Sequence, residues 1–217
     1  MTLLISNYAN LVFDCDGVLL NSNAVKTGAF YRVAAEIDEE SAQALVAHHV
    51  ANGGISRNQK FLWLAERLQI SENRERWVAL RCAEFAEQVV AGLMRCEARD
   101  LVSLRARYPD GCWFVVSGGA QDELRQVFEQ RDLARFFDGG IFGSPQAKDQ
   151  ILSLLRQRGA LKGKSLFLGD SRYDCEVALR HELDFVFVHG WSDVSDWQTL
   201  CEAFHVPAIG SIEELAD

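Results

Sequence analysis

The sequence predicts an α/β protein in which a parallel sheet is interrupted, directly after its first strand, by a helical insert. The first observation is that short apolar runs, bounded by Gly, Asp or Ser, alternate with helical patterns along residues 11–14 and 113–188. The second is that apolar residues recur at intervals of three and four from about residue 23 to residue 99. An insert at this place would overhang the carboxyl end of the first strand like a lid.

The first strand, residues 11–14, is an apolar run that ends abruptly in charge. Asp14 and Asp16 stand one residue apart, and Gly17 follows them. In α/β proteins ligands bind at the carboxyl ends of strands, and two carboxylates this close repel each other unless a cation or a shared proton relieves them. The plain alternative is an Asp-Gly turn that ends a strand.

The insert consists of helical segments with few strand signals. These are residues 24–37, 41–50, 56–68 and 73–93. We therefore expect a core domain of residues 1–20 and 100–217, and a helical cap domain of residues 21–99.

The rest of the sheet follows the insert as alternating strands and helices. The predicted strands are residues 113–117, 141–142, 165–168 and 185–188. The predicted helices between them lie near residues 120–131, 149–158 and 174–181. This order is typical of a parallel sheet with helices on both faces.

The composition is that of an ordinary globular protein with one core and a smaller accessory unit, at 217 residues, 48% hydrophobic and 24% charged. A formal net charge of -9 argues against a nucleic-acid partner, which needs a basic surface, and is compatible with a bound divalent cation. The six cysteines include no C-x-x-C pair, so we expect reduced, mostly buried thiols and no zinc site.

Targeting signals are not expected. No apolar run is long enough to span a membrane. Residues 1–10 contain no basic residue, and Asp14 interrupts the apolar run that follows, which disfavours a secretory signal. We expect a cytoplasmic protein.

Polar signals also follow three later strands. They are Ser117-Gly118-Gly119, Lys148, and the stretch from Gly169-Asp170 to Asp174. Each has a plain alternative, since the glycines suit turns, a lysine is usually solvated, and an aspartate often caps a helix. The convergence of four such signals, each just after a predicted strand, favours a site.

These motifs resemble those of the haloacid dehalogenase superfamily, specifically its phosphatases with a helical cap after the first motif. The resemblance rests on Asp14-x-Asp16-Gly17-Val18, an apolar strand ending in Ser117-Gly118, Lys148, and Gly169-Asp170-Ser171-x-x-Asp174. It implies a Rossmann-like parallel sheet with the site at the carboxyl ends of its strands.

The resemblance also implies the roles of the acids. Asp14 would be the nucleophile that forms an aspartyl-phosphate, and Asp16 the general acid and base. Mg²⁺ would be the cofactor, held by the side chains of Asp14 and Asp170 and by the main-chain carbonyl of Asp16. Asp174 would bind a metal water or hold Lys148.

The phosphate oxygens would be held by Ser117, the amide of Gly118 and Lys148. Cys15 invites interpretation as a nucleophile, but strand alternation directs it away from Asp14 and Asp16, and no histidine adjoins it. Nothing marks the histidines of the insert, His48 and His49, as metal ligands.

The insert offers two candidate substrate contacts. The loop Gly53-Gly54-Ile55-Ser56-Arg57 resembles the cap loop of phosphoglycolate-phosphatase and β-phosphoglucomutase relatives, and Arg57 could grip an anionic or hydroxylated substrate. Its alternative is a surface arginine after a Ser56 N-cap. Lys26 lies where the cap begins and suits a hinge or a substrate contact; mutases of this type often have a histidine near there, so Lys26 weakens that assignment.

Two positions depart from the family pattern: many capped relatives have a second Asp where this chain has Asn21, and some have a Lys-Pro pair where Asp149 follows Lys148. Neither change removes a group that the mechanism requires. The leading hypothesis is a Mg²⁺-dependent phosphatase, monomeric or homodimeric, for a small metabolite such as a sugar phosphate or a phosphorylated sugar acid.

The alternatives are a β-phosphoglucomutase-like phosphosugar mutase and a non-catalytic metabolite-binding protein of the same fold. The mutase would use the same Asp14 and Asp16. A dehalogenase is disfavoured because its chemistry attacks carbon without Mg²⁺ and lacks the second aspartate of the first motif, which is present here as Asp16.

Overall fold

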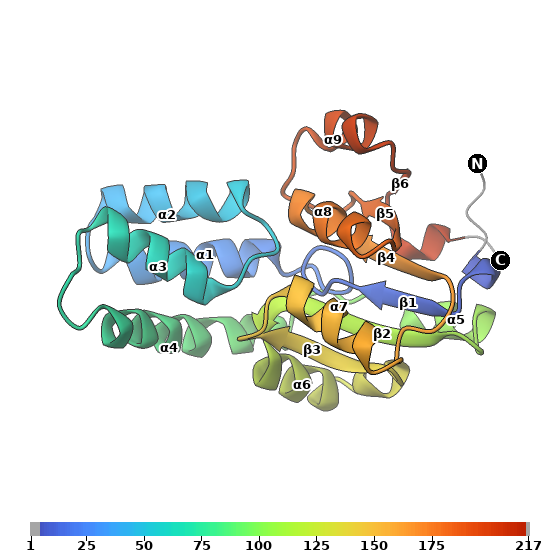
Figure 1. Cartoon of the computed structure of the whole chain (residues 1–217). Coiled ribbons are helices and arrows are strands. Elements are labelled where there is room, and N and C mark those ends of the chain that lie inside the picture. The colour runs from blue at the N-terminus through green and yellow to red at the C-terminus, as the bar shows by residue number, and fades with distance from the viewer. Residues whose placement is uncertain (1–4, 216–217) are drawn as a thin grey trace.

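The computed structural model describes residues 5–215 and confirms the α/β architecture (Figure 1). Its strands form one parallel sheet in the order β3-β2-β1-β4-β5-β6. The strands are β1 (Asn10–Phe13), β2 (Cys112–Ala120), β3 (Gly140–Ser144), β4 (Ser165–Gly169), β5 (Asp184–Val188) and β6 (Ala208–Ile209). β1 lies in the interior of the sheet, where Leu11 is paired with Trp113 on one side and Leu166 on the other.

Helices cover both faces of the sheet because β1 is apolar on both. Leu11 and Phe13 pack on the side of α5 (Leu101–Arg107) and α6 (Gln121–Gln130), whereas Val12 packs on the side of α7, α8 and α9. The last three helices are α7 (Lys148–Gln157), α8 (Arg172–Arg180) and α9 (Trp197–Phe204). Short 3-10 turns occupy Ile5–Asn7, Ala134–Phe136 and Ile212–Glu214.

The insert is a separate group of helices beside the sheet (Figure 1). It consists of α1 (Asn23–Ala35), α2 (Glu39–Ala51), α3 (Arg57–Arg67) and α4 (Arg74–Leu93). Phe30, Phe61 and Phe85 meet inside it, with the rings of Phe30 and Phe85 centred 4.3 Å apart. α3 begins after the Ser56 N-cap, whose hydroxyl accepts from the amide of Gln59.

Two chain segments connect the insert to the sheet, and they run side by side. Leu20 and Ala98 form an antiparallel bridge, and the amide of Asn21 donates to the carbonyl of Glu97 at 2.9 Å. This pairing supports the division into a core of residues 1–20 and 100–217 and a cap of 21–99, which stays a prediction. The ends of that core, residues 1–4 and 216–217, lie outside the described residues.

The structure differs from the predicted elements mainly in short segments. β2 continues through Ser117 to Ala120, so its glycines lie inside the strand. α5, α9 and β6 were not expected, because a helix of two turns or a strand of two residues carries too little periodicity to recognise.

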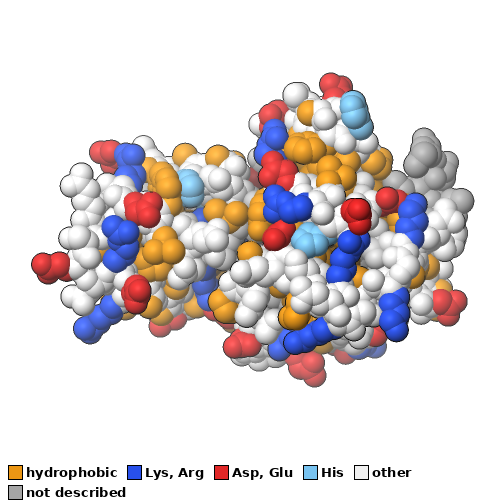
Figure 2. Space-filling model, viewed as in Figure 1, with side chains coloured by type: hydrophobic (Ala, Val, Ile, Leu, Met, Phe, Trp, Pro, Cys, Tyr) orange, Lys and Arg blue, Asp and Glu red, His pale blue; other side chains and the backbone are white. Residues whose placement is uncertain are grey.

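The outer surface carries charge of both signs. Figure 2 shows Lys and Arg side chains interspersed with Asp and Glu on the face in view, with no broad basic area. None of the helices between residues 5 and 215 is long and apolar enough to cross a membrane.

Candidate active site

The acids of the first and fourth motifs come together at the carboxyl end of the sheet. Asp14 follows β1, Asp170 follows β4 and Asp174 lies in the first turn of α8. All three are buried, and a carboxylate oxygen of each lies within 4.8 Å of the others. The fold thus brings together acids as far apart in the sequence as Asp14 and Asp174, which are 160 positions apart (174 minus 14).

Lys148 lies between these acids and is 1% exposed, so its alternative reading as a solvated surface lysine is wrong. It is the first residue of α7, and its Nζ lies 2.7 Å from Asp14 Oδ1 and 2.5 Å from Asp174 Oδ1. Burial opposes its charge, but the two carboxylates outweigh that effect and raise the pKa of Lys148. Lys148 is therefore a fixed cation at the site.

One lysine does not balance three acids. Burial raises the pKa of Asp14 to about 7, against the opposing effect of Lys148. Burial and repulsion from Asp14 and Asp174 raise the pKa of Asp170 well above its usual range. These carboxylates fit a divalent cation, since buried carboxylate oxygens are ligands that Mg²⁺ prefers and an ion would relieve their repulsion.

Asp16 faces a different environment. Its Oδ1 accepts a hydrogen bond from Ser22 Oγ at 2.6 Å, and its Oδ2 forms an ion pair with Lys26 of α1. Burial alone would raise the pKa of Asp16, but the charge of Lys26 and the hydrogen bonds from Lys26 and Ser22 outweigh burial and lower it. Its side chain lies outside the group of three acids, so its proposed place in the metal site depends on its main-chain carbonyl.

The second motif packs directly against the insert. Ser117 is fully buried, and its Oγ accepts from the amide of Gly119 at 3.0 Å. A Cβ at Gly118 would lie 2.4 Å from the carbonyl oxygen of Gly54, so only glycine allows this approach. The loop before α3 therefore lies on the end of β2 that is expected to hold phosphate.

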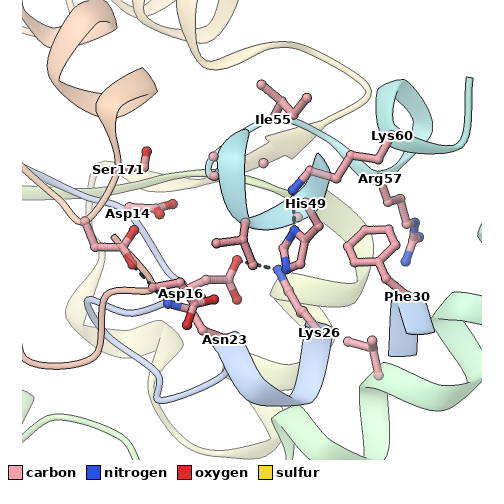
Figure 3. A pocket seen from close by; sticks show the side chains of 18 of the residues that line it. Asp14, Asp16, Asn23, Lys26, Phe30, His49, Ile55, Arg57, Lys60 and Ser171 are labelled. Atoms are coloured by element: carbon pink, nitrogen blue, oxygen red, sulfur yellow. Dashed lines mark hydrogen bonds and ion pairs between the residues drawn. The ribbon is translucent and has the colours of Figure 1, made fainter. Parts of the chain in front are cut away.

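A pocket that is partly open to solvent lies between the sheet and the insert. Figure 3 shows Asp14 and Ser171 towards one end and Lys60 and Arg57 towards the other. The apolar part of its wall includes Phe30, Ile55, Phe85, Val89, Leu93 and Leu124. An apolar wall with charged groups at both ends is typical of a site for a small molecule.

Arg57 lines this pocket but already has a partner. Its Nη1 and Nη2 donate to Glu123 of α6 at 2.9 and 2.5 Å. The pair is half-buried and ties the insert to the core. Lys26, the other expected substrate contact, lines the pocket and is held by Asp16.

Sequence reasoning did not identify five polar residues of the pocket, which are Asn23, His49, Lys60, Glu123 and Asp193. Asn23 donates to Asp170 Oδ2 at 3.0 Å, Glu123 holds Arg57, and Lys60 is paired with His49. Lys60 follows Arg57 by three positions, which is the spacing of one helix face and was the available signal. The others depend on tertiary contacts that no local pattern encodes.

Cys15 is fully buried, which agrees with its rejection as a nucleophile. Burial and the nearby Asp16 raise the pKa of its thiol well above the ordinary value, so the thiolate is disfavoured.

Comparison with solved structures shows the same fold in other proteins. A predicted phosphatase from Clostridium acetobutylicum is 20% identical, with a TM-score of 0.73 over 96% of each chain. A predicted phosphoglycolate phosphatase from Haemophilus somnus is 17% identical, with a TM-score of 0.64 over 85% of this chain and 86% of the other. A proposed β-phosphoglucomutase from Thermotoga maritima is 18% identical, with a TM-score of 0.63 over 95% of this chain and 96% of the other.

At such low identity these likenesses show the fold alone. No curated protein matches the chain. The haloacid dehalogenase-like hydrolase family, however, matches residues 8–181, which include all four motifs. The chain therefore belongs to the haloacid dehalogenase-like hydrolases and is an enzyme of that class.

Proposed function

We propose that this hydrolase is a Mg²⁺-dependent phosphatase that acts on a small phosphate monoester through an aspartyl-phosphate. The observation that carries the proposal is the pairing of unlike acids at the end of β1. Asp14 lies beside Lys148 and Asp170, whereas Asp16 is paired with Lys26, and both acids line the pocket. Two carboxylates with such different surroundings suit two different chemical roles.

In the first step the Asp14 carboxylate attacks phosphorus, and the bond from phosphorus to the leaving oxygen breaks. Asp16 gives its proton to that oxygen. Lys26 and Ser22 lower the pKa of Asp16, but a phosphate dianion that enters the pocket would raise it and favour the protonated form, because like charges repel. In the second step water attacks the aspartyl-phosphate, Asp16 takes its proton, and inorganic phosphate and free Asp14 result.

Asp14, Asp170 and the main-chain carbonyl of Asp16 would hold the metal. When bound, Mg²⁺ neutralises charge on the phosphoryl oxygens and on the attacking carboxylate. Asp174 has another task, because Lys148 and Ser171 occupy its two oxygens at 2.5 and 2.6 Å. It fixes the Lys148 ammonium where non-bridging phosphate oxygens would lie.

Ser117 and the amide of Gly118 complete the proposed phosphate site. The Gly54 carbonyl packs against Gly118, so the loop before α3 covers this end of the pocket. Such a cover allows only small substrates to enter and keeps bulk water away from the aspartyl-phosphate.

The test is phosphate release from a panel of sugar phosphates and phosphorylated acids, with Mg²⁺ and with chelator. Wild type should release phosphate only with Mg²⁺, and Asp14→Asn should lose at least about 1000-fold in kcat. Asp184→Asn is the matched control, since Asp184 begins β5 and pairs with Lys164.

Metal-independent release, or full activity in Asp14→Asn, would refute the proposal. Little net release combined with isomerisation of a sugar phosphate, stimulated by a bisphosphate, would favour the mutase instead.

A further inference from the structure

A lysine and a histidine form a buried pair in the part of the pocket made by the insert. Lys60 of α3 is 2% exposed, and its Nζ lies 2.6 Å from Nδ1 of His49 on α2. The ammonium lies 5.4 Å from the ring centre of Phe30. Both Lys60 and His49 line the pocket, and Figure 3 shows their side chains beside Lys26 and Phe30.

Lys60 differs from the other cations that line the pocket. Lys26 is paired with Asp16 and Arg57 with Glu123, but no carboxylate within residues 5–215 forms an ion pair with Lys60. A buried ammonium without a counter-ion is costly, and the pocket is the side from which an anion can reach it.

His49 adds a second donor to the same place. When Lys60 is charged, its ammonium can only donate, so Nδ1 accepts and the hydrogen of the neutral ring is on Nε2. Nε2 is buried and has no hydrogen-bond partner among the described residues. The pair thus presents an ammonium and an N–H group, with no acceptor of its own left over.

We propose that Lys60 and His49 bind a carboxylate on the leaving group of the substrate. This deepens the proposed phosphatase function and rests on it: the substrate class is a phosphorylated hydroxy acid or sugar acid. One ammonium and one neutral N–H match the single charge and the two oxygens of a carboxylate. A second phosphate dianion would bring charge that this pair does not compensate.

The electrostatic surroundings of the pair support this assignment. Burial and the nearby Lys26 lower the pKa of Lys60 to about 7, and burial and Lys60 lower that of His49 to about 3. An anion bound at Lys60 would raise its pKa again and offset the cost of its burial. At the phosphate end Asp14 lines the pocket, and the Lys148 ammonium lies 2.7 Å from it, so the two anionic groups of such a substrate would each have a separate lysine nearby.

The test compares phosphoglycerate with glycerol phosphate, which differ by a carboxylate in place of a hydroxymethyl group. Wild type should favour phosphoglycerate in kcat/KM, and Lys60→Met should reduce this preference by about 10- to 100-fold, mainly through KM. Lys60→Arg should restore part of the preference because it keeps the charge. Arg67→Met is the matched control: it removes a cation from the same helix, outside the pocket, and should keep the preference.

Binding separates a failure of this inference from a failure of the phosphatase proposal. In an Asp14→Asn background, which does not turn over, phosphoglycerate should bind about 10-fold or more tightly than glycerol phosphate, and Lys60→Met should remove the difference. Hydrolysis without carboxylate preference, or a preference that persists in Lys60→Met, would overturn the role of Lys60 and leave the phosphatase standing. Carboxylate-selective binding without hydrolysis by wild type would overturn the phosphatase proposal and leave the role of Lys60 standing. If wild type showed neither hydrolysis nor carboxylate-selective binding, both proposals would be overturned.

Discussion

Asp14 and Asp16 are neighbours in the sequence with opposite electrostatic surroundings. Burial raises the pKa of Asp14 to about 7, whereas Lys26 and Ser22 overcome burial and lower that of Asp16. The sequence indicated both acids, because charge at the end of an apolar strand is conspicuous. It could not indicate their surroundings, since Lys148 reaches Asp14 from a helix that begins 134 positions later (148 minus 14).

Gly17 shows how closely the acids are packed. Its φ is +74°, and a Cβ there would lie 2.0 Å from Asp170 Oδ2. Gly159 provides a control with φ of +65° but a Cβ position 3.6 Å from Lys162, which is ordinary contact. The two glycines therefore share the backbone constraint and differ in the clash.

We expect Gly17→Ala and Gly159→Ala each to lose about 1–2 kcal/mol of stability from the left-handed backbone. Gly17→Ala should also displace Asp170 and raise the Mg²⁺ concentration for half-maximal activity by about 10-fold or more. Gly159→Ala should leave that concentration unchanged. Thermal unfolding and Mg²⁺ titration of activity measure the two effects, and equal metal titrations for both variants would contradict the proposed ligand role of Asp170.

Among the elements, the long helices of the insert and the interior strands were predicted with small shifts at their ends, because their apolar periodicity is strong. Short elements at the periphery, such as α5 and β6, were not. The same limit applies to Arg57, whose place on α3 was expected while its partner on α6 was not. Which residue Arg57 contacts depends on how the insert packs against the core, and this packing is determined by contacts between segments that are distant in the sequence.

The Arg57–Glu123 pair predicts a specific pattern of kinetics. If it holds α3 against α6, Arg57→Met and Glu123→Gln should each lower kcat/KM several-fold, and the double variant should be no worse than Arg57→Met alone. The coupling should be on the order of 1 kcal/mol for this half-buried pair. If Arg57 binds substrate instead, its substitution will cost as much in the Glu123→Gln background as in wild type.

The control for this cycle is the exposed pair of Arg67 and Glu40, which joins α3 to α2 within the insert. Its two single variants and double variant should leave kcat/KM nearly unchanged, because exposed ion pairs contribute at most about 1 kcal/mol and this one is away from the pocket.

In the proposed enzyme, the reacting groups lie at the end of the sheet and the groups that select the substrate lie on the insert. Sequence motifs predicted the first, since its residues follow strands whose ends must meet. They did not predict the second, because Lys60 and His49 come from two helices with no shared motif. The pocket between the two parts therefore contains a buried cation, Lys60, whose charge would serve the proposed carboxylate binding and opposes folding.

That opposition predicts a pH dependence of stability. The folded-state pKa of Lys60, about 7, is below its ordinary value of 10.5 because of burial and Lys26, with Asp16 and Asp14 opposing. Between these two pKa values the unfolded chain binds more protons than the folded chain. The loss of folding stability caused by burying Lys60 is therefore complete below about pH 7 and decreases as the pH rises towards about 10. Lys60→Met removes this ammonium, so without substrate it should increase the free energy of unfolding near pH 7 by on the order of a few kcal/mol. The increase should become smaller towards pH 10.

Chemical denaturation of wild type, Lys60→Met and Arg67→Met across this pH range measures the effect, without substrate. The stability of Arg67→Met should run parallel to that of wild type at every pH, because the Arg67 side chain is exposed and lies outside the pocket. A Lys60→Met variant that is less stable at all pH values would mean that the contacts of Lys60 with His49 and Phe30 outweigh its burial. In that case the Lys60 ammonium would stabilise the insert, and Lys60 would favour both folding and carboxylate binding.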